Sequence, residues 1–477
     1  MIFLILALSL ILRLVNLGQS LWLDEAISVN IARSLPFKSI ILYFSPSDFH
    51  PPLFYLVLKS WVWLFGASEI SARLPSVIFG LATVYVIYLL GKKLYEEKIA
   101  LIAATLLATA PLHIYYSQEA RMYMLAAFLV SLSAYFFMSV LEKDKIVNWV
   151  GFILSTALML YSDYIPYLML PLYFVYLFLI RRKVTRSTLI GFIPAFLLIF
   201  ILIAPWLLVL PSQLKLGLSV SAASPAWAKV VGSSHIKDLG IAFVKFTIGR
   251  ISNDNNLIYA ILFAPVGLFV TVLFLFSLFR MSLKRFFLWM WLFFPVLSAF
   301  LISQFIPVFT YFRFIFVLVP FYLIWASAIN TVNIQKLVRL LLFGALAVNL
   351  VPTAIYYVNP KFQRENWRDA TDYVRQKSTQ NSVILFESAN TFAPFDYYSK
   401  GYLKAYGALN SFAANPDEVN SNVKRLTQGV NKVFLFQYLS GITDPQGLVY
   451  KELIMSGFGN TGTKNFDGVG FVYEFTR

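Results

Sequence analysis

Eleven apolar stretches divide this sequence, and most of them have the roughly 17 to 25 residues that an α-helix needs to cross a membrane. They cover residues 1–17, 72–91, 98–116, 122–141, 147–162, 164–180, 187–210, 257–279, 286–306, 314–332 and 338–358. The first stretch lacks a basic start and a small-residue cleavage site, so we expect a retained span rather than a signal peptide. The sequence therefore predicts an all-α polytopic membrane bundle of about 11 transmembrane helices.

Composition separates the chain from soluble globular proteins. Hydrophobic residues make up 59% of the 477 and charged residues 13%, whereas soluble domains have about 45–50% and about 25%. The chain contains no Cys, which excludes disulfides and thiolate metal sites. Its net charge of +16 does not indicate nucleic-acid binding, because Lys and Arg are scattered between the apolar runs as topology signals near anionic lipid.

Alternate connections between the apolar stretches are strongly basic. The basic residues are Lys92, Lys93 and Lys98; Lys143 and Lys145; Arg181, Arg182, Lys183 and Arg186; Arg280, Lys284 and Arg285; Lys336 and Arg339. The positive-inside rule puts all five connections in the cytoplasm. We therefore expect a cytoplasmic amino terminus and an extracytoplasmic tail after residue 358, in the plasma or inner membrane of the cell.

The segment "PPLFYLVLKSWVWLFG", residues 51–66, is apolar but is not counted as a span. Counting it would place every later basic connection outside, and it is short, with Lys59 in its middle. We expect an amphipathic helix in the outer interface, with Trp61 and Trp63 at headgroup level. Residues 18–71 then form one large outer loop.

Two outer segments differ in composition from the bundle, which we assign to residues 1–358. In the tail, 359–477, helical spacing alternates with short buried-strand candidates, and "NPDEVNSNVKRLTQGV" indicates a helix that begins at Asn415. This pattern predicts a small extracytoplasmic α/β domain. Residues 211–256 are rich in Pro, Gly, Ser and Asn, and we expect a mobile outer flap there.

Several ionisable residues lie at the outer side of the bundle without a topological role. They are Asp24 and Glu25 after the first span, Glu119 and Arg121 in "YYSQEARMY", and His50, Arg73, Asp163 and Arg313. Ionisable groups at such depth are costly and usually face a cavity or pair with each other. Arg forks suit phosphate, and carboxylates suit a base or a metal. Each also has a structural interpretation, as a snorkelling anchor, a helix end or a simple ion pair.

A resemblance to a known family strengthens the functional interpretation. "LWLDEAIS", "HPPLFYLVL", "SEISARLPSVIFGLATVYVIY", "YYSQEARMYML" and "RENWRDATDYV" are similar to the polyprenyl-phosphate-sugar-dependent glycosyltransferases of the GT-C superfamily. The closest group is the family 39-like branch of protein mannosyltransferases and aminoarabinose transferases. The resemblance covers residues 1 to about 140 well and "YFRFIFVLVPFY" moderately.

The resemblance implies a GT-C fold that transfers a sugar from a dolichyl or undecaprenyl phosphate to an acceptor hydroxyl on the outer face. It makes Asp24 the catalytic base, with Glu25 in support and Glu119 as the acidic residue of the second outer loop. We expect Arg121 and Arg313 to bind the donor phosphate, with His50 and Arg73 as weaker partners. The sequence lacks the D-x-D of oligosaccharyltransferases, and some relatives have Lys in place of His50. Use of a divalent cation therefore stays an open alternative, and the metal ligands are unknown.

A sugar phosphate carries a good leaving group, so the enzyme needs a base for the acceptor and cations for the departing phosphate. Direct attack by the acceptor inverts the anomeric centre and requires no covalent nucleophile. The acceptor is a protein, a lipid or a polysaccharide. Two alternatives use the same charges: a transporter or flippase for lipid-linked saccharides, and a glycan ligase or polymerase. Transporters often show two halves with broken spans, and no such internal symmetry is visible here.

Overall fold

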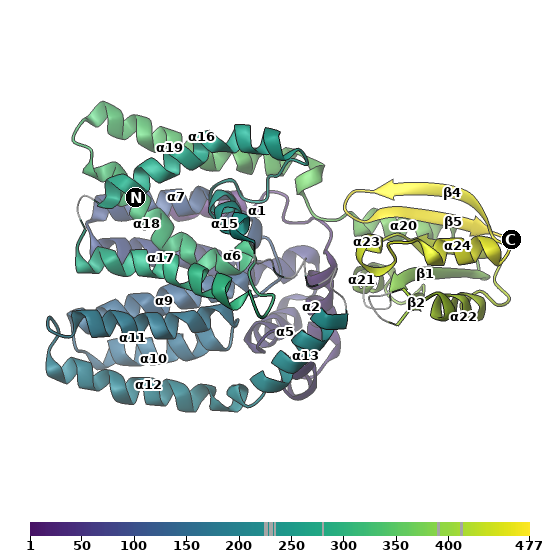
Figure 1. Cartoon of the computed structure of the whole chain (residues 1–477), viewed down its shortest axis with the longest axis horizontal. Coiled ribbons are helices and arrows are strands. Elements are labelled where there is room, and N and C mark those ends of the chain that lie inside the picture. The colour runs from purple at the N-terminus through teal and green to yellow at the C-terminus, as the bar shows by residue number, and fades with distance from the viewer. Residues whose placement is uncertain (224–227, 229–231, 233–234, 279–280, 389–391, 411–413) are drawn as a thin grey trace.

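The chain forms a helical bundle with a smaller sheet-containing domain at one end (Figure 1). The computed structural model describes residues 1–477 except 224–227, 229–231, 233–234, 279–280, 389–391 and 411–413. The bundle contains α1 (Ile2–Leu14), α6 (Glu69–Leu94), α7 (Glu97–Thr109), α8 (Pro111–Ser117), α9 (Tyr123–Glu142), α10 (Ile146–Leu160), η2 (Ile165–Leu168), α11 (Met169–Ile180), α12 (Arg186–Leu207), α16 (Asn256–Leu278), α17 (Leu283–Ile302), η3 (Tyr311–Val317), α18 (Leu318–Thr331) and α19 (Gln335–Val358). A short turn, η4 (Pro360–Phe362), leads out of the bundle.

Each of the eleven predicted spans coincides with helical structure, but the helices differ in length. Among the described residues, 7 are long and apolar enough to cross a membrane, or 8 if the pair α7 and α8, bent by 60°, is one span. The other three are shorter apolar helices, namely α1, α10 and the continuous run of η2 and α11. Helix α1 stops early because Val15 adopts an extended conformation (ψ 126°), and Asn16 after it has a left-handed φ of 58°. Its 13 residues span about 20 Å, less than a hydrocarbon core of about 30 Å.

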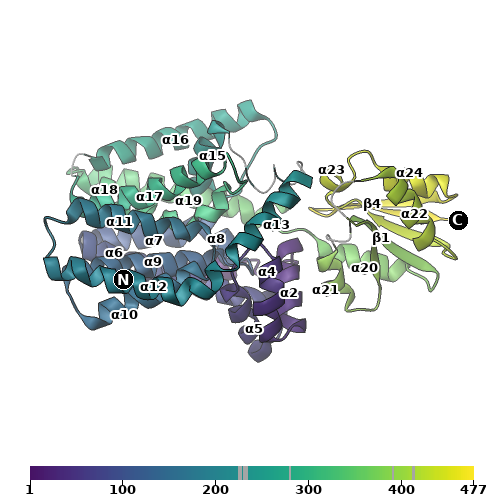
Figure 2. The ribbon, with the colours of Figure 1, turned by 60° about the horizontal axis from the view of Figure 1, so that its bottom comes forward.

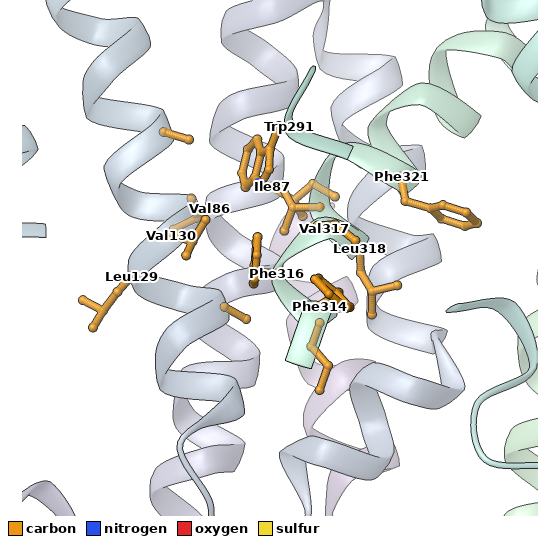
Figure 3. Packing of buried hydrophobic residues seen from close by; sticks show 14 of the residues in the cluster. Val86, Ile87, Leu129, Val130, Trp291, Phe314, Phe316, Val317, Leu318 and Phe321 are labelled. Atoms are coloured by element: carbon orange, nitrogen blue, oxygen red, sulfur yellow. The ribbon is translucent and has the colours of Figure 1, made fainter. Parts of the chain in front are cut away.

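The bundle core is packed around η3 and α18. Their run, Tyr311–Thr331, is 89% buried over its most apolar window, and its side chains contact α6, α9 and α17 (Figure 3). The labelled residues of this cluster are Val86, Ile87, Leu129, Val130, Trp291, Phe314, Phe316, Val317, Leu318 and Phe321. A run that is apolar all round is expected at such a central position.

The first outer loop is folded into short helices. They are α2 (Leu23–Ser34), α3 (Phe37–Ser39), the π-helical η1 (Ile40–Phe44), α4 (Ser45–Ser47) and α5 (Leu53–Phe65). Helix α5 occupies the segment in which the sequence predicted an interfacial helix. Trp63 on this helix is 81% exposed, as an anchor in the headgroup region would be.

The segment 211–256, expected to be an outer flap, contains two helices in its described part. They are α13 (Leu210–Ala223) and α15 (Ile236–Ile248). Helix α15 packs against α8, α19 and η3. This half of the segment therefore lies against the bundle, which the Pro-, Gly- and Ser-rich composition did not indicate.

The tail forms the predicted α/β domain. Its elements are α20 (Trp367–Lys377), β1 (Ser382–Ser388), α21 (Ala393–Ser399), β2 (Ala405–Leu409), α22 (Pro416–Leu426), β3 (Lys432–Phe436), α23 (Ser440–Thr443), α24 (Leu448–Met455), β4 (Gly459–Phe466) and β5 (Gly470–Thr476). As predicted, Asn415 begins α22, and its side chain accepts a hydrogen bond from the N–H of Asp417.

The five strands have the order β2-β1-β3-β5-β4. Strand β1 pairs in parallel with β2 and β3, and β5 pairs antiparallel with β3 and β4. One hydrophobic layer includes residues of α20 and α21, and the other includes residues of α22 and α24. The carboxyl terminus, directly after β5, lies far from the bundle (Figures 1 and 2). Because β3 runs antiparallel to β5, the carboxyl ends of β1, β2 and β3 face the bundle.

Candidate functional site

The two adjacent carboxylates of the first outer loop lie in the first turn of α2, and they have different environments. Glu25 is fully buried, and its Oε2 accepts from the backbone N–H of Trp22 (3.5 Å), which precedes the helix. Its Oε1 accepts from the backbone N–H of Ala120 (2.8 Å). Burial favours a higher pKa, but the neighbouring Arg73 guanidinium outweighs it and holds the pKa of Glu25 below its ordinary value.

Arg73 uses all five of its N–H donors within the protein. Its Nε and Nη2 donate to the two carboxylate oxygens of Glu25 (2.8 and 2.6 Å). Its Nη1 donates to the carbonyls of Leu17 (2.8 Å) and Gln19 (2.6 Å), and Nη2 also donates to Ser20 (2.9 Å). This geometry argues against the expected phosphate contact from Arg73. The Arg73–Glu25 pair instead fixes the start of the outer loop against α6.

Asp24 keeps an accessible face, with 32% of its side chain exposed. Its nearest cation is Arg121, whose Nη2 lies 3.6 Å from Asp24 Oδ2. The Nη1 of Arg121 donates to the hydroxyls of Ser28 (3.2 Å) and Tyr55 (3.3 Å). Arg121 is itself 5% exposed, so it lies behind Asp24 and orients this carboxylate.

His50 extends the same network through Asp48, which the sequence analysis did not select. Tyr55 donates its hydroxyl to Asp48 Oδ2 (2.6 Å), and His50 Nδ1 lies 3.4 Å from the same oxygen. Burial favours a higher pKa for Asp48, but His50, Arg121 and Tyr55 lower the pKa to about 2. The signal was present in "SDFHPPL", where an acid precedes His50 by two residues.

Glu119 pairs with the C-terminal tail. Its Oε2 accepts from Arg364 Nη1 (2.6 Å), and the two side chains are 1% and 2% exposed. Arg364 also donates to the hydroxyl of Tyr115 (2.6 Å) and lies 3.8 Å from the centre of its ring. Burial and the nearby Glu25 raise the pKa of Glu119. Glu119 and Arg121 do not form an ion pair with each other, because Glu119 pairs with Arg364 and Arg121 pairs with Asp24.

Arg250 is a cation that the sequence analysis missed, because it falls in the expected flap. It follows Gly249, whose φ of 66° ends α15. The Arg250 side chain is exposed, yet its Nη1 donates to Tyr115, the tyrosine that also binds Arg364. Its charge also lowers the pKa of Glu119 against the larger effect of burial. Arg250 therefore faces an accessible space beside the Glu119–Arg364 pair.

Arg313 and Asp163 have looser environments. Arg313 is partly exposed in η3, and its Nη1 donates to the carbonyl of Val308 (3.4 Å). Asp163 accepts from the backbone N–H of Tyr164 (2.6 Å), as a residue at a helix end would. Arg313 thus keeps donor capacity for a ligand, whereas Asp163 has the helix-end role left open by the sequence.

The carboxylates do not form a preassembled metal site. Within the part of the chain that the structure describes, no group of three or more His, Asp or Glu side chains is placed to hold a metal ion. Glu25 and Glu119 are each paired with an arginine. The donor set as arranged therefore does not fit a divalent cation, and we derive no step through one.

Comparisons with known proteins found one family model and several solved structures that are similar to this chain. The family model "Dolichyl-phosphate-mannose-protein mannosyltransferase" matches residues 49–209, about a third of the chain. The fold matches the oligosaccharyltransferase of Archaeoglobus fulgidus, solved with Zn and sulfate, at a TM-score of 0.60 and 13% identity over 99% of this chain and 72% of that one. No curated protein matches the sequence.

Two further solved structures show the same fold. ArnT from Cupriavidus metallidurans, bound to undecaprenyl phosphate, matches at a TM-score of 0.56 and 13% identity, with 99% of this chain and 97% of that chain covered. Archaeal oligosaccharyltransferase AglB from Archaeoglobus fulgidus, in complex with an inhibitory peptide and a dolichol-phosphate, matches at 0.58 and 13%, over 99% and 74%. The predicted resemblance is confirmed, and the chain has the fold of the GT-C glycosyltransferases.

Proposed function

We propose that this chain is an integral-membrane glycosyltransferase that moves a sugar from a polyprenyl-phosphate carrier to an acceptor hydroxyl on the outer face. The observation that carries the proposal is the accessible carboxylate of Asp24, held by Arg121 at 3.6 Å. The two other candidate carboxylates, Glu25 and Glu119, are buried and each bonded to an arginine. Asp24 is therefore the carboxylate best able to reach a substrate hydroxyl.

The reaction follows from these roles. Asp24 takes the proton of the acceptor hydroxyl as its oxygen attacks the anomeric carbon. The bond from that carbon to the phosphate oxygen breaks, and the polyprenyl phosphate leaves with the electron pair. Attack opposite to the leaving group inverts the anomeric centre, and no second carboxylate is needed as a nucleophile. The family match and the lipid-phosphate complexes of proteins with this fold support such a donor.

The donor phosphate binds best to cations that keep free donors. Arg250 and Arg313 meet this condition, and Arg forks suit phosphate oxygens. Arg121 and His50, also expected to contact the phosphate, are engaged with Asp24 and Asp48 and support those carboxylates. We therefore assign phosphate binding to Arg250 and Arg313 and the positioning of Asp24 to Arg121.

Replacement of the base tests the proposal. Asp24→Asn keeps the shape of the side chain and removes its basicity, so transfer should fall by roughly a hundredfold or more while donor binding survives. The assay measures release of labelled sugar from dolichyl- and undecaprenyl-phosphate donors by the purified chain. The exposed Asp417→Asn serves as a matched control. Near-normal transfer by folded Asp24→Asn protein contradicts the assignment and makes Glu119 the next candidate.

A transporter would behave differently in the same assay. It would bind the donor through the same cations but would leave the sugar–phosphate bond intact. Unchanged donor after prolonged incubation with the acceptor mixture, together with movement of the donor across vesicles, would therefore replace the proposed enzyme by a lipid-linked saccharide carrier.

A further inference from the structure

A groove of about 450 Å³ lies in the C-terminal domain, apart from the cluster around Asp24. Three segments line it: Glu365 before α20, residues 437–441 after β3, and the β4–β5 turn at 465–470. Its polar side chains are two carboxylates, two amides and two hydroxyls, from Glu365, Asp467, Gln437, Asn465, Ser440 and Tyr438. Such convergence of polar groups is typical of a ligand site.

The groove opens at the end of the domain that faces the bundle. Residues 437–441 follow the carboxyl end of β3, and that end points toward the bundle because β5 runs away from it (Figure 1). In sheets of parallel strands, ligands bind outside the carboxyl ends of the strands. The groove therefore lies at the carboxyl end of β3, between that strand end and the β4–β5 turn.

Helix α2 connects the groove to the carboxylate at the membrane. Leu23 of α2 belongs to the same hydrophobic cluster as Tyr438 and Phe466, which line the groove. Asp24 is the next residue in the chain. Its charge contributes to raising the pKa of Tyr438, although burial has the larger effect. The helix that carries Asp24 and the groove therefore share one hydrophobic cluster.

Glu365 forms a rigid part of the groove wall. It accepts hydrogen bonds from the Tyr438 hydroxyl (3.0 and 3.1 Å) and from the indole N–H of Trp367 (2.7 Å). The β4–β5 turn packs directly on it, since a Cβ added to Gly468 would lie 2.9 Å from Glu365 Cα. The preceding residue, Arg364, is fixed to Glu119. These contacts therefore fix the position of the groove relative to the bundle.

The lining favours a saccharide over a peptide. Carboxylates, amides and hydroxyls offer both donors and acceptors to neighbouring hydroxyl groups. An extended peptide would instead add to the free side of an edge strand. The edge strands are β2 and β4, and the groove is formed at strand ends rather than along their free sides.

We propose that this groove binds the saccharide part of a sugar-bearing acceptor and directs its receiving hydroxyl to Asp24. The inference rests on the proposed function, because the groove has this role only if Asp24 activates a hydroxyl. It narrows the acceptor from a protein, a lipid or a polysaccharide to a molecule that already carries sugar, whether a glycolipid or a glycan.

Binding to immobilised ligands tests the groove without requiring turnover. The purified full chain in nanodiscs is applied to an array of oligosaccharides that contain mannose, galactose, glucosamine or arabinose, with Ser- and Thr-containing peptides on the same surface. The double variant Asn465→Ala/Asp467→Ala removes two exposed groove side chains. The double variant Asp417→Ala/Asn420→Ala removes the same side-chain types from α22 and serves as the control.

The native chain and the control should bind at least one oligosaccharide class, and the groove variant should bind it about tenfold more weakly or worse, as the loss of two hydrogen bonds implies. Equal binding by the groove variant, absence of oligosaccharide binding, or binding of peptides alone would overturn the proposal. Binding of undecaprenyl phosphate to the same samples, measured by native mass spectrometry, separates a failure of the groove proposal from a failure of the proposed function. A chain that binds this lipid but no saccharide refutes the groove alone, whereas one that binds saccharide but neither this lipid nor dolichyl phosphate refutes the proposed donor.

Discussion

At the residue scale, the neighbours Asp24 and Glu25 show how little adjacency in sequence determines chemical role. Successive residues of a helix point about 100° apart. One carboxylate therefore faces the buried fork of Arg73, and the other faces accessible space beside Arg121. The sequence identified the pair and favoured Asp24 through family resemblance. The direction of each side chain depends on how α2 packs, which no local pattern encodes.

Arg364 and Arg250 could not be assigned from the sequence for the same reason, because their partners lie far away along the chain. Arg364 reaches Glu119 across 245 positions, and Arg250 reaches Tyr115 across 135. A single sequence carries no signal for such pairs. The composition around Arg250 indicated a flap, and the motif "RENWRDATDYV", which begins with Arg364, gave that arginine no role of its own.

Arg250 gives the prediction that separates phosphate binding from positioning. Arg250→Ala should weaken binding of undecaprenyl phosphate about tenfold or more, because a charged hydrogen bond to the phosphate is lost. Arg250→Lys should recover part of the affinity, since the charge remains but the fork does not. The measurement is lipid binding by native mass spectrometry. Arg186→Ala, an exposed arginine at the start of α12, is the control, and equal affinity in all four proteins would remove Arg250 from the site.

At the element scale, close helix packing in the bundle depends on small residues, as expected in membranes. Gly91 of α6 faces Ala100 of α7 so closely that an added Cβ would lie 2.6 Å from Ala100 Cα. Gly267 of α16 has no atom within 4 Å of such a Cβ. The length of the apolar stretches predicted both helices, but it did not distinguish the crowded glycine from the open one.

Gly91→Ala should therefore lower the thermal stability of the full chain in detergent, with an overpacking cost of about 1–3 kcal/mol. Gly267→Ala should leave stability unchanged or raise it slightly, because Ala is the better helix former. Intrinsic fluorescence during heating measures both variants. Equal melting temperatures of the two variants would show that α6 and α7 can move apart without loss of stability.

The sheet domain contains a carboxyl group whose charge opposes folding. Burial raises the pKa of Glu387 to about 8 from an ordinary value of 4.5, although the Thr443 hydroxyl donates to it (3.0 Å). The folded state therefore binds more protons than the unfolded state between these two values. The contribution of protonated Glu387 to the free energy of unfolding is fully present below about pH 4.5 and is lost as the pH rises toward about 8.

Glu387→Gln removes this dependence. Its melting temperature relative to the native chain should rise as the buffer is changed from pH 5 to about pH 8, because only the native chain has to ionise a buried group. The exposed Asp417→Asn should show no such trend. A constant difference between Glu387→Gln and the native chain across this range would contradict the raised pKa.

At the scale of the whole molecule, the order of the helices, the α/β tail and the bundle all followed from apolar length and composition. The number of full spans did not, because α1, α10 and the run of η2 and α11 are shorter than a hydrocarbon core requires. Early helix ends such as the one at Val15 depend on backbone conformation. Apolar residues continue beyond that end, so hydropathy alone does not mark it.

The orientation of the chain remains a prediction, and the absence of Cys makes it simple to measure. A single Cys introduced at Ser60 in α5, or at Lys464 in the C-terminal domain, should react with a membrane-impermeant maleimide from outside intact cells. A Cys at Lys183, in a basic connection, should react only after the membrane is opened, as the positive-inside rule requires. Protection at position 60 or 464 would reverse the topology.

The buried contact between Glu119 and Arg364 has a consequence for the order in which the protein is synthesised and folds. A ribosome makes the bundle first and reaches Arg364 only after residue 363. Until then Glu119 lacks the partner that neutralises it, and an unpaired buried charge is strongly unfavourable. The unfinished chain thus contains a buried carboxylate without its neutralising arginine. The bundle acquires this contact only when the tail has been made and has folded against it.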